Sequence, residues 1–83
     1  VVTREQMAAY VGRLYRAITG DACGSPSPFD DVSAESYAAG EVGCLYELGI
    51  TTGVSARRFA PHDELTRAQL ATFFARLYGV LSA

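Results

Sequence analysis

The sequence predicts an all-α fold, a small helical bundle of three main helices joined by long loops. Three observations support this prediction. Apolar residues recur with the spacing of an amphipathic helix in three separate segments. Residue patterns typical of helix N-termini stand before these segments. Stretches rich in Gly, Pro and Ser separate the segments, as expected for loops.

The first helix is expected to begin after Thr3 and to extend to Thr19. Thr3 and Gln6 have the spacing of a capping box, in which the Thr hydroxyl accepts from a backbone N–H one turn later and the Gln side chain reaches back to the N–H of the cap. Gly20 follows as the preferred residue for a left-handed C-terminal cap. The apolar stripe of this helix consists of Met7, Tyr10, Val11, Leu14, Tyr15 and Ile18.

The second helix is expected after a long loop that contains two prolines. Ser33 is a candidate N-cap, and Glu35 is favourable in a first turn. Gly49 is expected to end this helix. Gly40 and Gly43 each weaken a helix by up to about 1 kcal/mol relative to alanine, which indicates a close approach of another backbone. The apolar face of the helix consists of Tyr37, Ala38, Val42, Leu45 and Leu48.

The third helix is expected after a turn-rich connection, residues 50–64. It begins with a second capping box, Thr66 and Gln69. Its apolar stripe consists of Leu70, Phe73, Phe74, Leu77, Tyr78 and Leu81. On the stripes of the first and third helices, Tyr10, Tyr15, Phe73 and Phe74 are expected in the core.

The start of the third helix repeats the start of the chain. Val2–Tyr15 and Leu65–Tyr78 are identical at seven of fourteen positions, with an offset of 63 residues. In repeat proteins each unit buries one face against its neighbour. We therefore expect residues 1–20 to be the final helix of one repeat, 21–28 a loop, and 29–83 a complete second repeat.

Composition and charge exclude several classes of protein. The chain is 49% apolar with a net charge of −2, and its charges are scattered, which argues against disorder and against a nucleic-acid-binding stripe. No apolar run approaches the roughly 18 residues of a membrane span, and the N-terminus lacks a signal-peptide pattern. We therefore expect an excised piece or a mature fragment.

The sequence contains no recognisable catalytic or metal-binding cluster. Two cysteines and one histidine cannot supply the four ligands of a structural zinc site. Asp30 and Asp31 fall short of the six to eight oxygens that calcium needs, and Asp31 is expected to hold a turn or cap. His62 is expected in an exposed loop. We therefore expect no enzyme activity, no cofactor and no metal.

Cys23 and Cys44 either form a disulfide or remain two buried thiols. A disulfide would join the long loop to the second helix, close about 20 residues, and add roughly 2–4 kcal/mol. It would also indicate folding outside the reducing cytosol.

The ordered motifs from Phe29 to Gly79 resemble the S-layer homology repeat. The matching residues are Phe29, Asp31, Val32, Tyr37, Ala38, Val42, Leu45, Gly49, Ile50, Gly53, Phe59, Pro61, Leu65, Thr66, Arg67, Ala68 and Gln69. Val2–Tyr15 matches the final helix of a preceding repeat, and the variants found here are similar to those of secreted actinobacterial proteins. The resemblance implies a secreted module of the bacterial surface. Grooves between neighbouring repeats of this family bind cell-wall polysaccharide, often with an acidic pyruvate ketal.

The resemblance also implies candidate ligand-binding residues. Arg4 and Arg67 occupy the arginine position of the motif, and a guanidinium can meet a carboxylate with two parallel hydrogen bonds. The alternative for both is a solvated or salt-bridged first-turn residue. Tyr37 occupies the aromatic position and either stacks on a sugar or belongs to the core. Arg57 and Arg58 replace the usual Asp-Gly turn, either as polar loop residues or as a new site for an acidic sugar.

The sequence therefore favours a non-catalytic module that attaches a secreted protein to an acidic cell-wall glycan. The alternative is a structural or assembly domain that pairs with neighbouring repeats or a second copy of the chain without binding glycan. Neither interpretation involves nucleic acid or membrane insertion.

Overall fold

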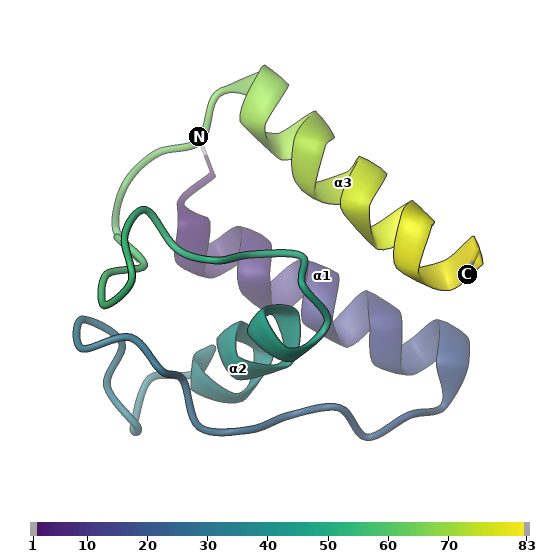
Figure 1. Cartoon of the computed structure of the whole chain (residues 1–83), viewed down its shortest axis with the longest axis horizontal. Helices are drawn as coiled ribbons and strands as arrows, with labels where there is room; N and C mark the ends of the chain where they lie inside the picture. Colours follow the sequence, from purple (N-terminus) through teal and green to yellow (C-terminus); the bar gives the residue numbers. More distant parts are fainter. Residues whose placement is uncertain (1, 83) are drawn as a thin grey trace.

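A computed structural model describes residues 2–82 and contains three helices (Figure 1). They are α1 (Arg4–Thr19), α2 (Ala39–Glu47) and α3 (Arg67–Ser82). The central helix α1 packs against both α2 and α3, which lie on different sides of it (Figure 1). Across residues 2–82, β pairing is limited to two isolated backbone bridges. The predicted all-α class is confirmed.

The caps of α1 form as the sequence predicts. The Thr3 hydroxyl accepts from the Gln6 N–H at 3.2 Å, and the Thr3 N–H donates to the Gln6 side-chain oxygen at 3.0 Å. At the other end, Gly20 has φ 74° and its N–H donates to the carbonyl of Arg16 at 2.9 Å. These interactions join residues that are close in sequence, so the local pattern is enough to predict them.

The second capping box opens α3 in the same way. The Gln69 N–H donates to the Thr66 hydroxyl at 3.1 Å, and the Thr66 N–H donates to the Gln69 side-chain oxygen at 2.9 Å. The chain just before α3 also pairs with the start of α1. The Arg4 N–H donates to the carbonyl of Asp63 at 2.9 Å, and the Leu65 N–H donates to the carbonyl of Val2 at 2.8 Å. The starts of the two motif copies are therefore tied to each other.

Helix α2 begins later than predicted. Ser33 does not cap it; its hydroxyl accepts from the Glu35 N–H at 3.2 Å and donates to the Glu35 carboxylate at 2.6 Å. These local bonds stabilise a turn, which competes with helix formation. The helix starts at Ala39, and its N-cap Ala38 makes no side-chain capping bond. Tyr37 therefore lies outside the helix.

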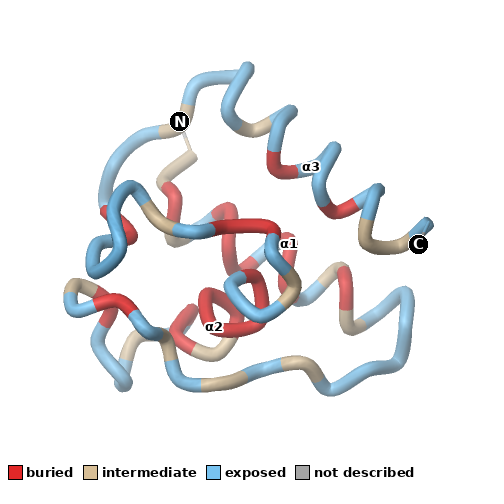
Figure 2. Tube along the Cα trace, in the orientation of Figure 1, coloured by how far each residue is buried: buried red, intermediate tan, exposed pale blue. Residues whose placement is uncertain are grey.

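The core lies mainly between α1, α2 and the loop that follows α2 (Figure 2). Its largest fully buried side chains are Phe59, Met7, Leu45, Ile50, Val11 and Val42. By contrast, α3 is exposed along most of its length, and only Phe73 and Leu77 are buried in it (Figure 2).

Four aromatic or aliphatic residues on the predicted stripes of α1 and α3 are exposed. Tyr10, Ile18 and Tyr78 are 61%, 57% and 72% exposed, and Phe74 is 36% exposed. The rings of Tyr10 and Phe74 pack edge-on at 5.9 Å on the surface between α1 and α3. The prediction that Tyr10 and Phe74 belong to the core is wrong, because α3 is covered on one side only.

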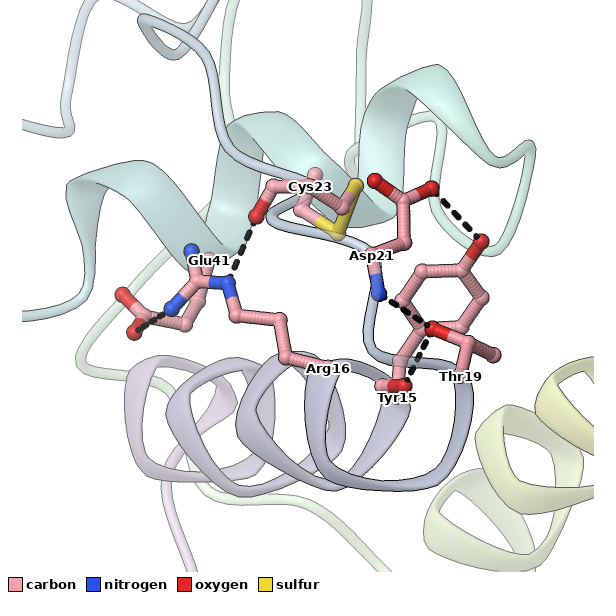
Figure 3. Close-up of a disulfide and its surroundings, with 7 residues drawn as sticks. Tyr15, Arg16, Thr19, Asp21, Cys23 and Glu41 are labelled. Carbon is pink, nitrogen blue, oxygen red and sulfur yellow. Dashed lines mark hydrogen bonds and ion pairs between the residues drawn. A yellow bond between two sulfur atoms is a disulfide. The ribbon is translucent and has the colours of Figure 1, made fainter.

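The structure pairs Cys23 with Cys44, so the disulfide alternative holds (Figure 3). The bridge ties the long loop to α2, and Cys44 is fully buried. Arg16 of α1 supports the same loop, because its Nε donates to the carbonyl of Cys23 at 2.6 Å and its Nη1 to Glu41 at 2.9 Å (Figure 3). Loop, α1 and α2 thus form one connected unit.

Two glycines of α2 were predicted to lie against another backbone, and only one of them does. A Cβ at Gly43 would collide with the backbone carbonyl of Ser25. A Cβ at Gly40 would lie 3.6 Å from the Arg16 guanidinium, which is an ordinary contact. The prediction is therefore confirmed for Gly43 and wrong for Gly40.

Candidate functional site

A groove of about 220 Å³ lies where the start of α1, the loop after α2 and α3 meet. It is lined by Arg4, Thr51, Thr52, Gly53, Gln69, Thr72, Phe73 and Arg76. Pockets for drug-sized ligands are typically about 300–1,000 Å³. The size of the groove therefore suits a single sugar unit or a substituent on one.

Arg4 forms the floor of the groove. It is only 7% exposed, and its Nε donates to the carbonyl of Phe59 at 2.6 Å. Its guanidinium carbon lies 4.7 Å from the ring centroid of Phe59 and 5.5 Å from that of Phe73, both within cation–π range. Burial lowers the pKa of Arg4, and the charges of Asp63 and Asp31 partly oppose this.

The loop after α2 is fixed by two glycines with positive φ. Gly49 has φ 76° and Gly53 has φ 82°, a backbone region that side chains disfavour. A Cβ at Gly53 would lie 2.6 Å from the carbonyl oxygen of Arg58. The buried Thr51 accepts through its hydroxyl from the Gly53 N–H at 3.1 Å. This wall of the groove is therefore set by the backbone, with Thr52 exposed on it.

Arg76 lines the groove and was not among the predicted site residues. It projects from α3, remains exposed, and its Nη1 donates to the carbonyl of Ile50 at 3.0 Å. Its guanidinium carbon lies 5.6 Å from the ring centroid of Phe73. Two signals in the sequence could have identified it. Arg76 is one of the positions conserved between the two motif copies, as Arg13, and it follows Thr72 by one helical turn.

Arg67 does not line the groove, although it occupies the same motif position as Arg4. It is exposed at the first position of α3. Arg4 makes its contacts with Phe59, 55 residues further along the chain. A ligand contact by Arg67 stays a prediction.

Arg57 and Arg58 lie in a tight turn outside the groove and interact with the two adjacent aspartates. Arg57 and Asp30 form two hydrogen bonds of 2.7 and 3.1 Å, and this pairing lowers the pKa of Asp30 and raises that of Arg57. Arg58 lies 3.9 Å from the carboxylate of Asp31. Binding of an acidic sugar by these arginines stays a prediction, and it would have to compete with the aspartates.

Asp31 holds the loop that carries the partner of Arg4. Its carboxylate accepts from the N–H groups of Phe59 and Ala60, both at 2.8 Å. Burial raises the pKa of Asp31, but these hydrogen bonds and the charge of Arg58 outweigh burial, so the pKa lies below its ordinary value. The expectation that Asp31 stabilises a turn is confirmed.

Tyr37 lies neither in the core nor in the groove. It is 56% exposed and borders a separate, more open depression of about 530 Å³ beside α1. The lining of that depression is completed by Gln6, Ala9, Tyr10, Arg13 and Leu14. The structure thus separates Tyr37 from Arg4, and contact of Tyr37 with a sugar stays a prediction.

Residues 2–82 contain no group of three or more His, Cys, Asp or Glu side chains that could hold a metal ion. Among the helices that these residues form, none has the length and apolar character to cross a membrane. His62 is exposed, as expected.

Comparison with known proteins gives the family. Residues 28–71 match the S-layer homology domain. A cell surface protein of Thermoanaerobacter kivui is 36% identical over 80 residues, which cover 94% of this chain and 10% of that protein. An endoglucanase of Bacillus sp. (strain KSM-635) is 35% identical over 80 residues, which cover 96% of this chain and 8% of that protein.

The chain thus spans about a tenth of the length of these relatives. No solved structure matches it. The extent of the domain match and the identity to both relatives show that the chain belongs to the S-layer homology family, as a module of the bacterial cell surface.

Proposed function

We propose that the chain attaches a secreted protein to an acidic cell-wall polysaccharide without catalysing a reaction, and that the groove binds the glycan. One observation carries this proposal. Arg4 of the first motif copy, the Thr51–Gly53 loop and Gln69 of the second copy line one groove, although they lie far apart in the sequence. The Thr51–Gly53 loop and Gln69 lie within residues 28–71, which match the S-layer homology domain, and Arg4 has the same motif position as Arg67.

The groove offers the hydrogen-bonding groups that a sugar needs. Thr52 and Thr72 present hydroxyl groups, and Arg4 and Arg76 present guanidinium groups. Guanidinium groups form strong charge-assisted hydrogen bonds with carboxylates. Phe73 adds an apolar surface between them. The combination suits an anionic sugar unit better than an apolar ligand.

The two relatives support attachment as the shared role. One is named a cell surface protein and the other an endoglucanase, yet both contain a segment similar to this chain in about a tenth of their length. If the segment has a function of its own, such as attachment, it can occur in proteins whose other parts do different things.

Sedimentation with cell walls tests the proposal. The disulfide-bonded chain is mixed with sacculi of its own organism, either intact or after extraction of their polysaccharide. It should sediment with intact sacculi only. Sedimentation with neither, by a chain with an intact helical spectrum, contradicts attachment. Equal sedimentation with both contradicts the polysaccharide as ligand.

A matched pair of variants tests the groove. Thr52→Tyr fills the groove from an exposed position, whereas Val54→Tyr adds the same ring to an exposed residue outside its lining. We expect only Thr52→Tyr to abolish sedimentation. Equal binding by both variants would place the ligand elsewhere.

A second candidate function is assembly with a neighbouring S-layer homology repeat. An apolar depression of about 460 Å³ lies between α1 and α3 and is lined by Val2, Gln6, Met7, Tyr10, Val11, Leu70 and Phe74. Contiguous exposed apolar surface often marks a protein contact. The two helices carry the same motif, and repeats bury such faces against each other, which favours another repeat as the partner.

The parent protein tests this second candidate. Tyr10→Ser combined with Phe74→Ser should increase protease sensitivity between repeats if the face is covered by another repeat. Unchanged sensitivity contradicts that partner. Light scattering of the isolated chain adds a further test, because a stable dimer would identify a second copy as the partner instead.

A further inference from the structure

The groove contains two arginines, Arg4 and Arg76, and neither forms a direct ion pair within the described part of the chain. The ion pairs formed among residues 2–82 use Arg13, Arg16, Arg57 and Arg58, and none of them involves Arg4 or Arg76. The chain as a whole carries a net charge of −2. The groove is therefore a locally cationic site on an acidic protein, which favours an anionic ligand.

The two arginines differ in what they can offer to a ligand. Arg4 is buried, its Nε is bonded to the Phe59 carbonyl, and its guanidinium packs against the rings of Phe59 and Phe73. Arg76 is exposed, and within the described part of the chain its one hydrogen bond goes from Nη1 to the carbonyl of Ile50. Since a guanidinium has five N–H donors, Arg76 keeps most of them for a ligand.

Arg76 is also held in place. The Ile50 carbonyl fixes one of its nitrogens at 3.0 Å, and the Phe73 ring lies beneath its guanidinium at 5.6 Å. A guanidinium group that is already oriented loses less side-chain entropy when it binds the two oxygens of an anionic group. Arg76 is therefore accessible, charged and oriented, whereas Arg4 is charged and buried.

On the basis of the proposed attachment function, we propose that Arg76 determines specificity by binding an anionic group of the wall glycan, and that Arg4 supports the groove from below. Carboxylate and phosphate substituents share the pair of anionic oxygens that a guanidinium fork recognises. A neutral glycan lacks that pair. The groove should therefore discriminate glycans by charge through Arg76.

The experiment compares the affinities of the chain for the native wall polymer and for the same polymer after chemical reduction of its carboxyl groups. We expect a loss of about 10-fold or more on reduction, since a hydrogen bond to a charged group contributes on the order of 1.4 kcal/mol or more. A phosphate as the anionic group gives a different result. The wild-type chain then binds the reduced polymer with full affinity, and Arg76→Gln loses affinity for both polymers by an amount that depends on the salt concentration.

Three variants separate recognition from structural support. Arg76→Gln removes the charge. The ratio of the affinities for native and reduced polymer should then be close to one, and binding should depend less on the salt concentration. Arg76→Lys keeps the charge and should retain part of the ratio. Arg67→Gln is the matched control, because Arg67 lies on the same helix outside the groove, and it should leave the ratio unchanged.

The outcomes distinguish this proposal from the proposed function. Binding of neither polymer by the wild-type chain refutes attachment, and this proposal with it. Binding by the wild type with the same ratio and salt dependence in Arg76→Gln overturns the role of Arg76 alone. An equal, salt-independent loss for both polymers in Arg76→Gln would assign Arg76 a structural role through Ile50, and would also overturn it.

Discussion

Arg4 is buried by contacts that its neighbours in the sequence do not reveal. A first-turn arginine opposes the helix dipole by a few tenths of a kcal/mol, so the sequence indicates only that some compensating partner exists. That partner is the Phe59 carbonyl together with the Phe59 and Phe73 rings, 55 and 69 residues away. Local patterns cannot identify partners at such separations. Arg76 could have been singled out by its repetition in both motif copies, but its bond to Ile50 depends on where the loop after α2 lies.

Asp31→Asn should destabilise the loop that holds Arg4. The carboxylate accepts from two backbone N–H groups, and an amide offers only one acceptor oxygen for them. An unsatisfied N–H costs about 1–3 kcal/mol, and we expect a loss of this size in urea unfolding at pH 7. Asp30→Asn is the control, because its exposed pair with Arg57 should matter little. Equal effects of both changes would contradict the account.

The same aspartate predicts how stability depends on pH. The pKa of Asp31 is lowered in the folded chain, so its contribution is complete above the ordinary value of 3.8 and is lost as the pH falls through the folded pKa. The midpoint of thermal unfolding should therefore fall more steeply below pH 4 in the wild type than in Asp31→Asn. Parallel pH profiles of the two proteins would exclude this contribution.

At the scale of elements, the two glycines of α2 should respond in opposite ways to alanine. Gly43→Ala places a methyl group against the Ser25 carbonyl, and overpacking of this kind typically costs about 1–3 kcal/mol. Gly40→Ala meets only the flexible Arg16 side chain and should stabilise the helix by up to about 1 kcal/mol. Urea unfolding of both variants measures the contrast. Stabilisation by Gly43→Ala would show that the loop does not pack on α2.

The sequence predicts elements best where their signals are local. The capping boxes of α1 and α3 and the Gly20 cap join residues within four positions, and all three form as predicted. The start of α2 was wrong, because Ser33 uses the same side-chain chemistry to stabilise a turn with Glu35. The exposed faces of α1 and α3 were also assigned wrongly, because periodicity shows that a face is apolar but not what covers it.

At the scale of the whole molecule, the Cys23–Cys44 bridge should contribute a large share of stability. Closing a loop of this length contributes about 3 kcal/mol in the chain-entropy description. Replacing both cysteines with serine should therefore lower the unfolding midpoint by on the order of 10–20 °C. Scanning calorimetry checks this, with reduced wild-type chain as the control. An unchanged midpoint would mean that Arg16 and the packing of Ser25 on Gly43 hold the loop without the bridge.

The division of the chain into repeats remains a proposal at this scale. The domain match begins at residue 28, next to the proposed boundary at residue 29. Helix α1, assigned to the preceding repeat, nevertheless packs against α2, and its Glu5 N–H donates to the carbonyl of Pro61 at 2.9 Å. We therefore expect a chain that begins at residue 21 to lose cooperative unfolding, although it keeps the whole second repeat.

The central claim is that the groove between α1, α3 and the loop after α2 binds the wall polysaccharide. The most direct test is a titration of the isotope-labelled chain with solubilised wall polymer, followed by amide and guanidinium NMR shifts. If the polymer binds in this groove, the largest changes should occur at Thr51–Gly53, Gln69, Thr72 and the side chain of Arg76. Changes confined to Tyr37 and Tyr10 beside α1, or no changes at saturating polymer, would contradict it.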